Sequence, residues 1–156
     1  MNHVAVGVAG LFALFLGMGA MAAPGHNAGQ SHSPVGQPGD PKRINRTISV
    51  EMNDEMRFVP DSISVKSGET IRFVVKNIGE MKHEMMFGTK KEIDEHAKVM
   101  QQFPDMEHDD GSSITLAPGK TGEIIWRFSR AGTFMFGCLM PGHVEAGMIG
   151  RVTVRR

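Results

Sequence analysis

The chain has 156 residues, with 17 acidic and 17 basic side chains and a formal net charge of zero at pH 7. This balance argues against a nucleic-acid binder or a polybasic membrane-surface protein, since both need an excess of positive charge. The length suits one domain of modest size, and the single cysteine excludes an internal disulfide bond.

The amino-terminal segment has the features of a secretory signal peptide. From Val4 to Ala23 the chain is apolar without an acidic or basic side chain, and Ala20-Met21-Ala22 matches the small-x-small pattern of a cleavage site. We predict a signal peptide over residues 1–22, cleaved after Ala22 or Ala23, and therefore a periplasmic protein that has no membrane attachment after cleavage. Because the first residues carry little positive charge, an uncleaved membrane anchor is the alternative.

Residues 23–43 are rich in glycine, proline, serine, asparagine and glutamine and have almost no large apolar side chain. Such a composition does not bury enough surface to offset the entropy lost on ordering. We predict a flexible leader, followed by one folded domain over residues 44–156.

The domain consists of short strand-like runs separated by turns with glycine, proline and asparagine. Within one run, Ile71, Phe73 and Val75 share a face, with Arg72 and Lys76 on the opposite face, which indicates a half-buried strand in an antiparallel sheet. Many short strands at nearly regular spacing favour an all-β Greek-key sandwich or barrel. The predicted strands are Arg46–Met52, Ser62–Val65, Thr70–Lys76, His83–Phe87, Ser113–Leu116, Gly122–Phe128, Gly132–Gly137 and Met148–Val154.

One segment, residues 89–106, has a different period. A stripe with i, i+3, i+4 spacing, with lysine and glutamate between its members, is formed by Glu92, Ile93, His96, Val99, Met100 and Phe103. This pattern predicts a short helical insertion between two strands.

The most informative motif lies near the carboxyl end, where Cys138 precedes His143 by five residues and Met148 by ten. A thiolate, an imidazole and a thioether, joined by a second histidine, form the ligand set of a blue-copper electron-transfer site. His83, at the start of a predicted strand, is the best candidate for that second histidine. A buried inert cysteine is the simpler interpretation of Cys138 alone, and zinc is a competing metal that a methionine ligand suits poorly.

An upstream strand histidine followed by a Cys-x4-His-x4-Met loop resembles the cupredoxins, which are small type 1 copper proteins. The loop is similar to those of auracyanin and rusticyanin. The signal segment, the leader, the methionine-rich first ligand motif and the helical insertion resemble the periplasmic copper-tolerance cupredoxins of the CopI type. This resemblance covers residues 44–156 and implies one copper centre, with His83 and His143 bound through ring nitrogens, Cys138 through its thiolate and Met148 through a long axial sulfur bond.

Two residues near these ligands carry further expectations. Many cupredoxins have asparagine or serine directly after the first histidine, whereas this chain has Glu84. A carboxylate there would accept a bond from the ligand loop and favour Cu(II) over Cu(I). Gly142 would let the backbone approach the metal without obstruction by a Cβ atom.

Additional copper ligands are a further hypothesis, because thioethers and imidazoles also bind copper. Core packing is the alternative for the methionines, and a solvated tail without metal is the alternative for the leader histidines. The candidates are Met81, Met86, Met140, His26 and His32.

The resemblance implies a binding protein and not an enzyme. Cys138 lies between Gly137 and Leu139 and not between the histidines that, in multicopper oxidases, pass electrons to a second copper centre. Two functions remain: copper tolerance by binding or oxidising Cu(I) together with one-electron transfer, or a dedicated electron carrier to a respiratory or photosynthetic partner. We expect a monomer whose partners are copper ions and a transient redox protein, such as a cytochrome or a copper oxidase.

Overall fold

The computed structural model describes residues 33–104, 106 and 111–156. The predicted signal peptide, the first part of the leader and both His26 and His32 lie outside the described residues. Within the described ranges, none of the helical structure has the length and apolar character needed to span a bilayer.

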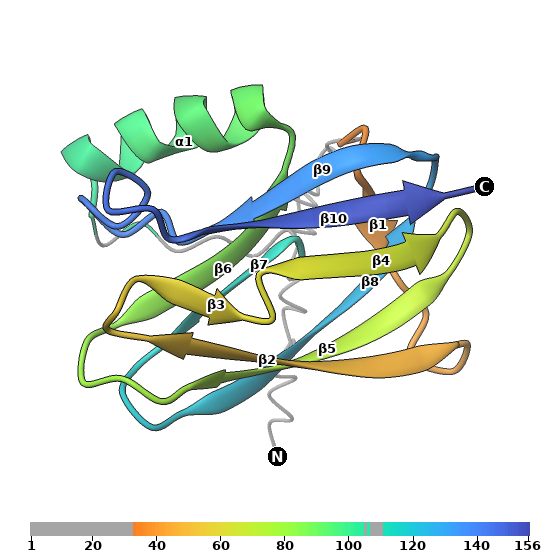
Figure 1. Cartoon of the computed structure of the whole chain (residues 1–156), viewed down its shortest axis with the longest axis horizontal. Helices are drawn as coiled ribbons and strands as arrows, with labels where there is room; N and C mark the ends of the chain where they lie inside the picture. The colour runs from red at the N-terminus through yellow and green to blue at the C-terminus, as the bar shows by residue number, and fades with distance from the viewer. Residues whose placement is uncertain (1–32, 105, 107–110) are drawn as a thin grey trace, which may run out of the picture.

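The described chain forms two five-stranded sheets that enclose one hydrophobic core (Figure 1). The first sheet has the order β1-β8-β5-β2-β3 and the second the order β4-β10-β9-β6-β7. The strands are β1 (Gly36–Pro38), β2 (Arg46–Asn53), β3 (Arg57–Val59), β4 (Ser62–Lys66), β5 (Thr70–Asn77), β6 (His83–Gly88), β7 (Ser113–Leu116), β8 (Thr121–Phe128), β9 (Gly132–Gly137) and β10 (Ile149–Arg155). The predicted all-β sandwich with a helical insertion is confirmed.

The expectation of an antiparallel sheet is wrong in one respect, because each sheet contains one parallel pair. β2 pairs with β5 in parallel, and β4 pairs with β10 in parallel. After β3 the chain crosses to the second sheet to form β4 and then returns to the first sheet to form β5. This crossing brings β5 back beside β2 in the same direction, whereas two strands joined by a hairpin would run antiparallel.

Aromatic side chains from both sheets meet in the centre of the core. The ring of Phe87, on β6, lies 4.9 Å from Phe73, 5.8 Å from Phe128 and 6.1 Å from Phe136, measured between ring centroids. Phe136, on β9, also contacts Phe58 edge-on at 5.0 Å. Such pairs contribute about 0.5–1.5 kcal/mol beyond the area that they bury. Because β6 and β9 also carry His83 and lead into Cys138, this aromatic cluster supports both strands of the predicted metal site.

The helical insertion forms one helix, α1 (Lys90–Gln102), which is shorter than the predicted span. Thr89 begins it with a capping box: its side chain accepts from the Glu92 amide, and the Glu92 side chain accepts from the Thr89 amide. Ile93 and Met100 are its buried residues. Figure 1 shows α1 at the end of the sandwich where the β9–β10 loop lies, and Gln101 Nε2 donates to Glu145 Oε1 of that loop at 2.9 Å.

The carboxyl-terminal part of the expected flexible leader is a strand. β1 pairs antiparallel with β8, and Val35, directly before it, is fully buried. A Cβ atom on Gly36 would lie only 2.2 Å from the carbonyl oxygen of Arg127, so glycine permits this close pairing. The ordered sandwich therefore begins before residue 44, while the remaining boundaries stay predictions.

This arrangement predicts that a chain starting at residue 33 is more stable than one starting at residue 44. The shorter chain loses β1 and the burial of Val35, and a fully buried valine side chain alone contributes about 1.5–3 kcal/mol. Urea unfolding of both chains measures the difference. Gly36→Ala in the longer chain should lower the midpoint in the same direction, and equal midpoints for the two chain lengths would show that β1 contributes nothing.

Candidate metal centre

The predicted ligands lie at one end of the sandwich, where β6 begins and the β9–β10 loop connects two neighbouring strands. His83 is the first residue of β6, and Cys138 directly follows β9. β6 and β9 pair antiparallel with Met86 opposite Gly137. This register places the main-chain amide of Glu84 next to Cys138, where it donates to Sγ at 3.2 Å.

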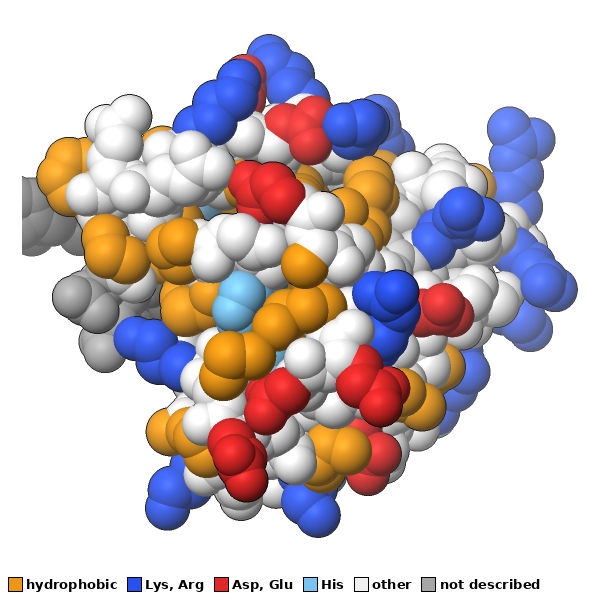
Figure 2. Space-filling view, turned by 60° about the vertical axis from the view of Figure 1, so that its left-hand side comes forward, with side chains coloured by type: hydrophobic (Ala, Val, Ile, Leu, Met, Phe, Trp, Pro, Cys, Tyr) orange, Lys and Arg blue, Asp and Glu red, His pale blue; other side chains and the backbone are white. Residues whose placement is uncertain are grey.

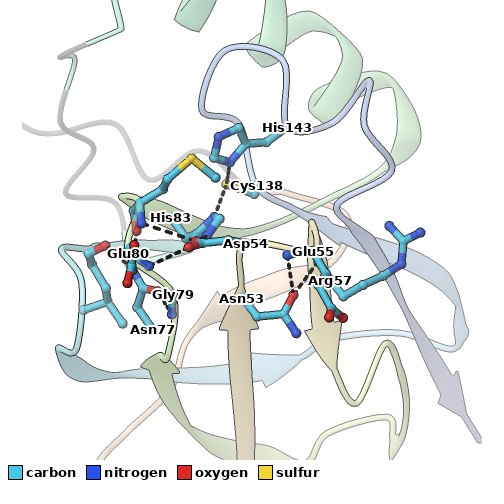
Figure 3. Close-up of polar contacts among 12 residues, drawn as sticks. Asn53, Asp54, Glu55, Arg57, Asn77, Gly79, Glu80, His83, Cys138 and His143 are labelled. Atoms are coloured by element: carbon cyan, nitrogen blue, oxygen red, sulfur yellow. Dashed lines mark hydrogen bonds and ion pairs between the residues drawn. The ribbon is translucent and has the colours of Figure 1, made fainter.

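Three donor atoms converge at this point. Those of His83, Cys138 and His143 all lie within 4.8 Å of one another. Cys138 Sγ is 3.2 Å from His143 Nδ1 and 3.8 Å from His83 Nδ1 (Figure 3). Both imidazoles therefore present Nδ1 toward the sulfur, so that the three donor atoms face one point that a metal ion could occupy.

The β9–β10 loop is closed by its own main-chain hydrogen bonds. The Cys138 amide donates to the Met148 carbonyl at 3.1 Å, and the Met148 amide donates to the His143 carbonyl at 2.9 Å. The His143 amide in turn donates to the Met140 carbonyl at 3.0 Å. These bonds bring the main chain of Met148 beside Cys138, and the Met148 side chain is fully buried. The main chain of the predicted axial ligand thus lies next to Cys138 and His143.

Gly142 serves the shape of this loop. Its φ is +83°, a left-handed conformation that glycine adopts without strain. A Cβ atom there would meet no protein atom within 4 Å, so the need for glycine comes from the turn and not from crowding by neighbouring protein atoms.

The electrostatics of the site suit a metal cation. Burial raises the pKa of the Cys138 thiol to about 11, and the nearby charge of Glu84 acts in the same direction, although amide bonds to the sulfur oppose the shift. Burial, followed by the neighbouring His83, lowers the pKa of His143 and so keeps its imidazole neutral. A bound cation reverses the preference of a thiol for its protonated form. Neutral imidazoles and a thiol that is deprotonated only on binding are the donors that a type 1 copper ion takes.

Glu84 is buried, with 1% of its surface exposed, and its main-chain amide lies beside the sulfur. Because successive side chains of a strand alternate, the Glu84 side chain points to the face opposite that of His83, where it is buried. After burial, the charge of Glu84 is a lesser cause of the raised pKa of Cys138. The influence of this carboxylate on the copper site stays a prediction.

One residue that the sequence did not single out touches the site. Asp54, in the turn between β2 and β3, lies 2.9 Å from Nε2 of His83 through its Oδ1 atom. The turn residues Asn53-Asp54-Glu55 resemble those of any surface hairpin, so the only signal in the sequence was an acidic side chain at the tip of a turn. The pairing depends on two loops that are distant along the chain.

The three methionines considered as extra ligands differ in how far they are exposed to solvent. Met140 is buried in the core cluster with 8% exposure, Met86 is half-buried, and Met81 is 41% exposed.

Figure 2 shows the end of the molecule that carries the site, where imidazole surface is surrounded by hydrophobic side chains with acidic side chains near them. His143 is half-buried, whereas His83 is fully buried, so His143 is the ligand with access to the surface.

Comparison with known families agrees with this geometry. Residues 44–155 match the model of a family described as copper binding proteins, plastocyanin/azurin family. The chain belongs to this family. A cupredoxin with this donor set holds one type 1 copper centre, which is the cofactor predicted from the ligand motif.

Three curated relatives are each described as a copper-resistant cuproprotein CopI. The one from Rubrivivax gelatinosus is 45% identical over 157 residues, which cover 95% of this chain and 93% of that protein. The one from Vibrio cholerae is 36% identical, covering 75% of this chain and 70% of the relative, and the one from Pseudomonas aeruginosa is 33% identical, covering 91% of each. The predicted resemblance to cupredoxins of the CopI type is confirmed.

The fold is similar to solved auracyanin structures. Auracyanin B has a TM-score of 0.66 and 21% identity, with 78% of this chain and 97% of that chain covered. Auracyanin A from Chloroflexus aurantiacus has a TM-score of 0.61 and 22% identity, with 70% and 98% covered. At these identities the likeness supports the cupredoxin fold alone.

The arrangement predicts that Cys138→Ser abolishes the visible absorption of the Cu(II) protein. The absorption of a type 1 site arises from the bond between a thiolate and the metal, and a hydroxyl does not supply this bond. Absorption and paramagnetic resonance spectra of the copper-loaded variant test the loss, with circular dichroism as the control for a folded sandwich. Colour retained in the variant would contradict the role of Cys138.

The raised pKa of Cys138 predicts that copper uptake releases a proton. A thiol with a pKa of about 11 is protonated at pH 8 and must lose its proton to bind as a thiolate. His143, whose pKa is lowered, is already neutral at that pH and releases none. We expect about one proton per copper in an unbuffered titration, and an apparent affinity that falls about tenfold per pH unit as the pH decreases. Cys138→Ser should release none, and proton-free uptake by the native chain would overturn this expectation.

Proposed function

We propose that this cupredoxin is a periplasmic copper-tolerance protein that binds or oxidises Cu(I) at one site formed by His83, Cys138, His143 and Met148. The observation that carries the proposal is the convergence of the donor atoms of His83, Cys138 and His143 within 4.8 Å. Met148, in the same loop as Cys138 and His143, is hydrogen-bonded to Cys138 through the main chain. The names of the three relatives, all described as copper-resistant, supply the physiological context.

Bound copper supplies one-electron chemistry, and the protein residues determine how it is used. Thiolate and thioether sulfurs suit Cu(I), whereas imidazole nitrogens suit Cu(II), so this donor set serves both oxidation states. The burial of Cys138 and His83 excludes water from the thiolate. His143, which is half-buried, provides the edge through which an electron passes to a transient redox partner such as a cytochrome or a copper oxidase.

The second candidate function is a dedicated electron carrier with no role in copper handling. The hydrophobic surface around imidazole in Figure 2 favours weak docking of a redox partner in either case. The two functions differ in the extra ligands: a tolerance protein gains from Met81, Met86, Met140 and the leader histidines His26 and His32 as further copper sites, whereas a carrier needs one tight site only.

Deletion of the gene in the host tests the proposal. We expect loss of growth only under copper stress, restored by the native gene and not by a gene carrying Cys138→Ser. The substitution Met135→Leu, at a half-buried methionine of β9 that is not a candidate ligand, is the matched control and should restore growth. Loss of respiratory or photosynthetic electron flux without copper sensitivity would instead support the carrier.

Copper stoichiometry of the purified mature protein adds a second readout to the same test. One tight equivalent is expected from the His-Cys-His-Met site, and further weaker equivalents are expected if the extra ligands take part. If the native protein binds no copper stoichiometrically, both candidate functions fail.

A further inference from the structure

A single carboxylate joins the turn before β3 to the loop before β6. Asp54 accepts hydrogen bonds from the main-chain amide of Glu80 at 2.6 Å and from that of Met81 at 3.3 Å. Its Oδ1 atom also lies 2.9 Å from Nε2 of His83 (Figure 3). Asp54 is therefore bonded to the back of the predicted ligand imidazole, opposite the nitrogen that faces Cys138.

We infer that Asp54 is a positioning residue for the copper centre, which holds His83 in the tautomer and orientation that present Nδ1 to the metal and strengthens that nitrogen as a donor. This inference rests on the proposed function, since it concerns how the same site prefers one oxidation state of copper. In other metalloproteins a carboxylate bonded to a ligand histidine fixes the ring and raises its basicity.

The tautomer follows from hydrogen-bond chemistry. An ionised carboxylate only accepts hydrogen bonds, so the ring atom that faces it must carry the proton. Both oxygens of Asp54 accept from main-chain amides, those of Glu80 and Met81, an arrangement that favours the ionised carboxylate. With the proton on Nε2, the lone pair of Nδ1 points toward Cys138 Sγ, 3.8 Å away. The His83 side chain is fully buried, so hydrogen bonds from water do not determine its tautomer.

The turn that carries Asp54 is held in place by Asn53. Its Oδ1 accepts from the amides of Glu55 at 3.2 Å and Arg57 at 3.3 Å. Its carbonyl also accepts from the amide of Met56 at 3.2 Å. A side chain at the tip of a free hairpin would not keep one orientation, whereas this turn has three internal bonds.

The opposite loop is held by Asn77, which is fully buried. Its Nδ2 donates to the carbonyls of Met81 at 2.7 Å and Leu116 at 3.0 Å, and its Oδ1 accepts from the amide of Gly79 at 2.9 Å. Gly79 also lacks the Cβ atom that would lie 2.0 Å from Asp54 Oδ1. The loop is thus shaped to receive the carboxylate, which separates this arrangement from a chance surface contact.

The negative charge of Asp54 favours one oxidation state of copper over the other. A carboxylate hydrogen-bonded to a ligand imidazole makes it a better donor to the more positive ion, so Asp54 stabilises Cu(II) more than Cu(I). Removal of its charge should weaken Cu(II) binding more than Cu(I) binding and should raise the reduction potential of the site.

The test compares three variants of the copper-loaded mature protein. Asp54→Asn keeps an oxygen acceptor but removes the charge, and Asp54→Ala removes both. Glu55→Gln is the matched control, because it removes a carboxylate from the next position of the same turn. The Glu55 amide takes part in the hydrogen bonds of the turn, whereas the described part of the structure shows no bond from the Glu55 side chain to His83 or to the loop before β6. Chelator competition measures Cu(II) and Cu(I) affinities, redox titration measures the potential, and nitrogen-15 spectra of the copper-free protein identify the tautomer of His83.

We expect Cu(II) affinity to fall on the order of 10–100-fold in Asp54→Ala, with a smaller loss in Asp54→Asn, a higher potential in both and no change in Glu55→Gln. The Nε2-protonated form of His83 should dominate in the native chain and mix with the other tautomer in Asp54→Ala. If Asp54→Ala fails to fold, Asp54→Asn still decides through its potential. If all three variants share the native potential, Cu(II) affinity and tautomer, Asp54 is only a loop tie and the inference is wrong, although native copper binding would leave the proposed function intact.

Discussion

The pairing of β6 with β9 is the constraint on which the copper centre depends. Met86 lies opposite Gly137, and this register places the start of β6 beside the residue that follows β9. It brings His83 Nδ1 to 3.8 Å from Cys138 Sγ and lets the Glu84 amide donate to that sulfur. Since successive side chains of a strand point to opposite faces, a slip of one residue would turn His83 away from the cysteine.

The core beneath the site holds this register. Phe87 and Phe136 lie on the same two strands as the site, and they pack against each other and against aromatic rings of the first sheet. Donors fixed on packed strands change position little when copper changes its charge, and small rearrangement favours rapid electron transfer. The helix α1 adds a cover from outside, since Gln101 bonds to Glu145 in the ligand loop.

Two carboxylates flank the donor set on different sides. Burial and, to a lesser degree, the charge of Glu84 raise the pKa of Cys138, and Asp54 is bonded to the far nitrogen of His83. Negative charge around a metal site favours the more positive ion. A site that holds Cu(II) well suits a protein that takes up Cu(I) and passes its electron to a partner, which connects this charge arrangement to the proposed role in copper tolerance.

The sequence by itself determined every strand except β1 and β3, the helical insertion and the three candidate ligands of one loop. Alternation in β5 and the spacing of Cys138, His143 and Met148 are local patterns, and a loop of this length is short enough to hold three donors near each other. Only the tertiary structure decided that Asp54 meets His83, 29 residues away, and that Gly36–Pro38 forms a strand. An aspartate in a turn and a Gly-Gln-Pro run have no distinguishing local pattern, because their partners are supplied by a distant loop and by the edge of β8.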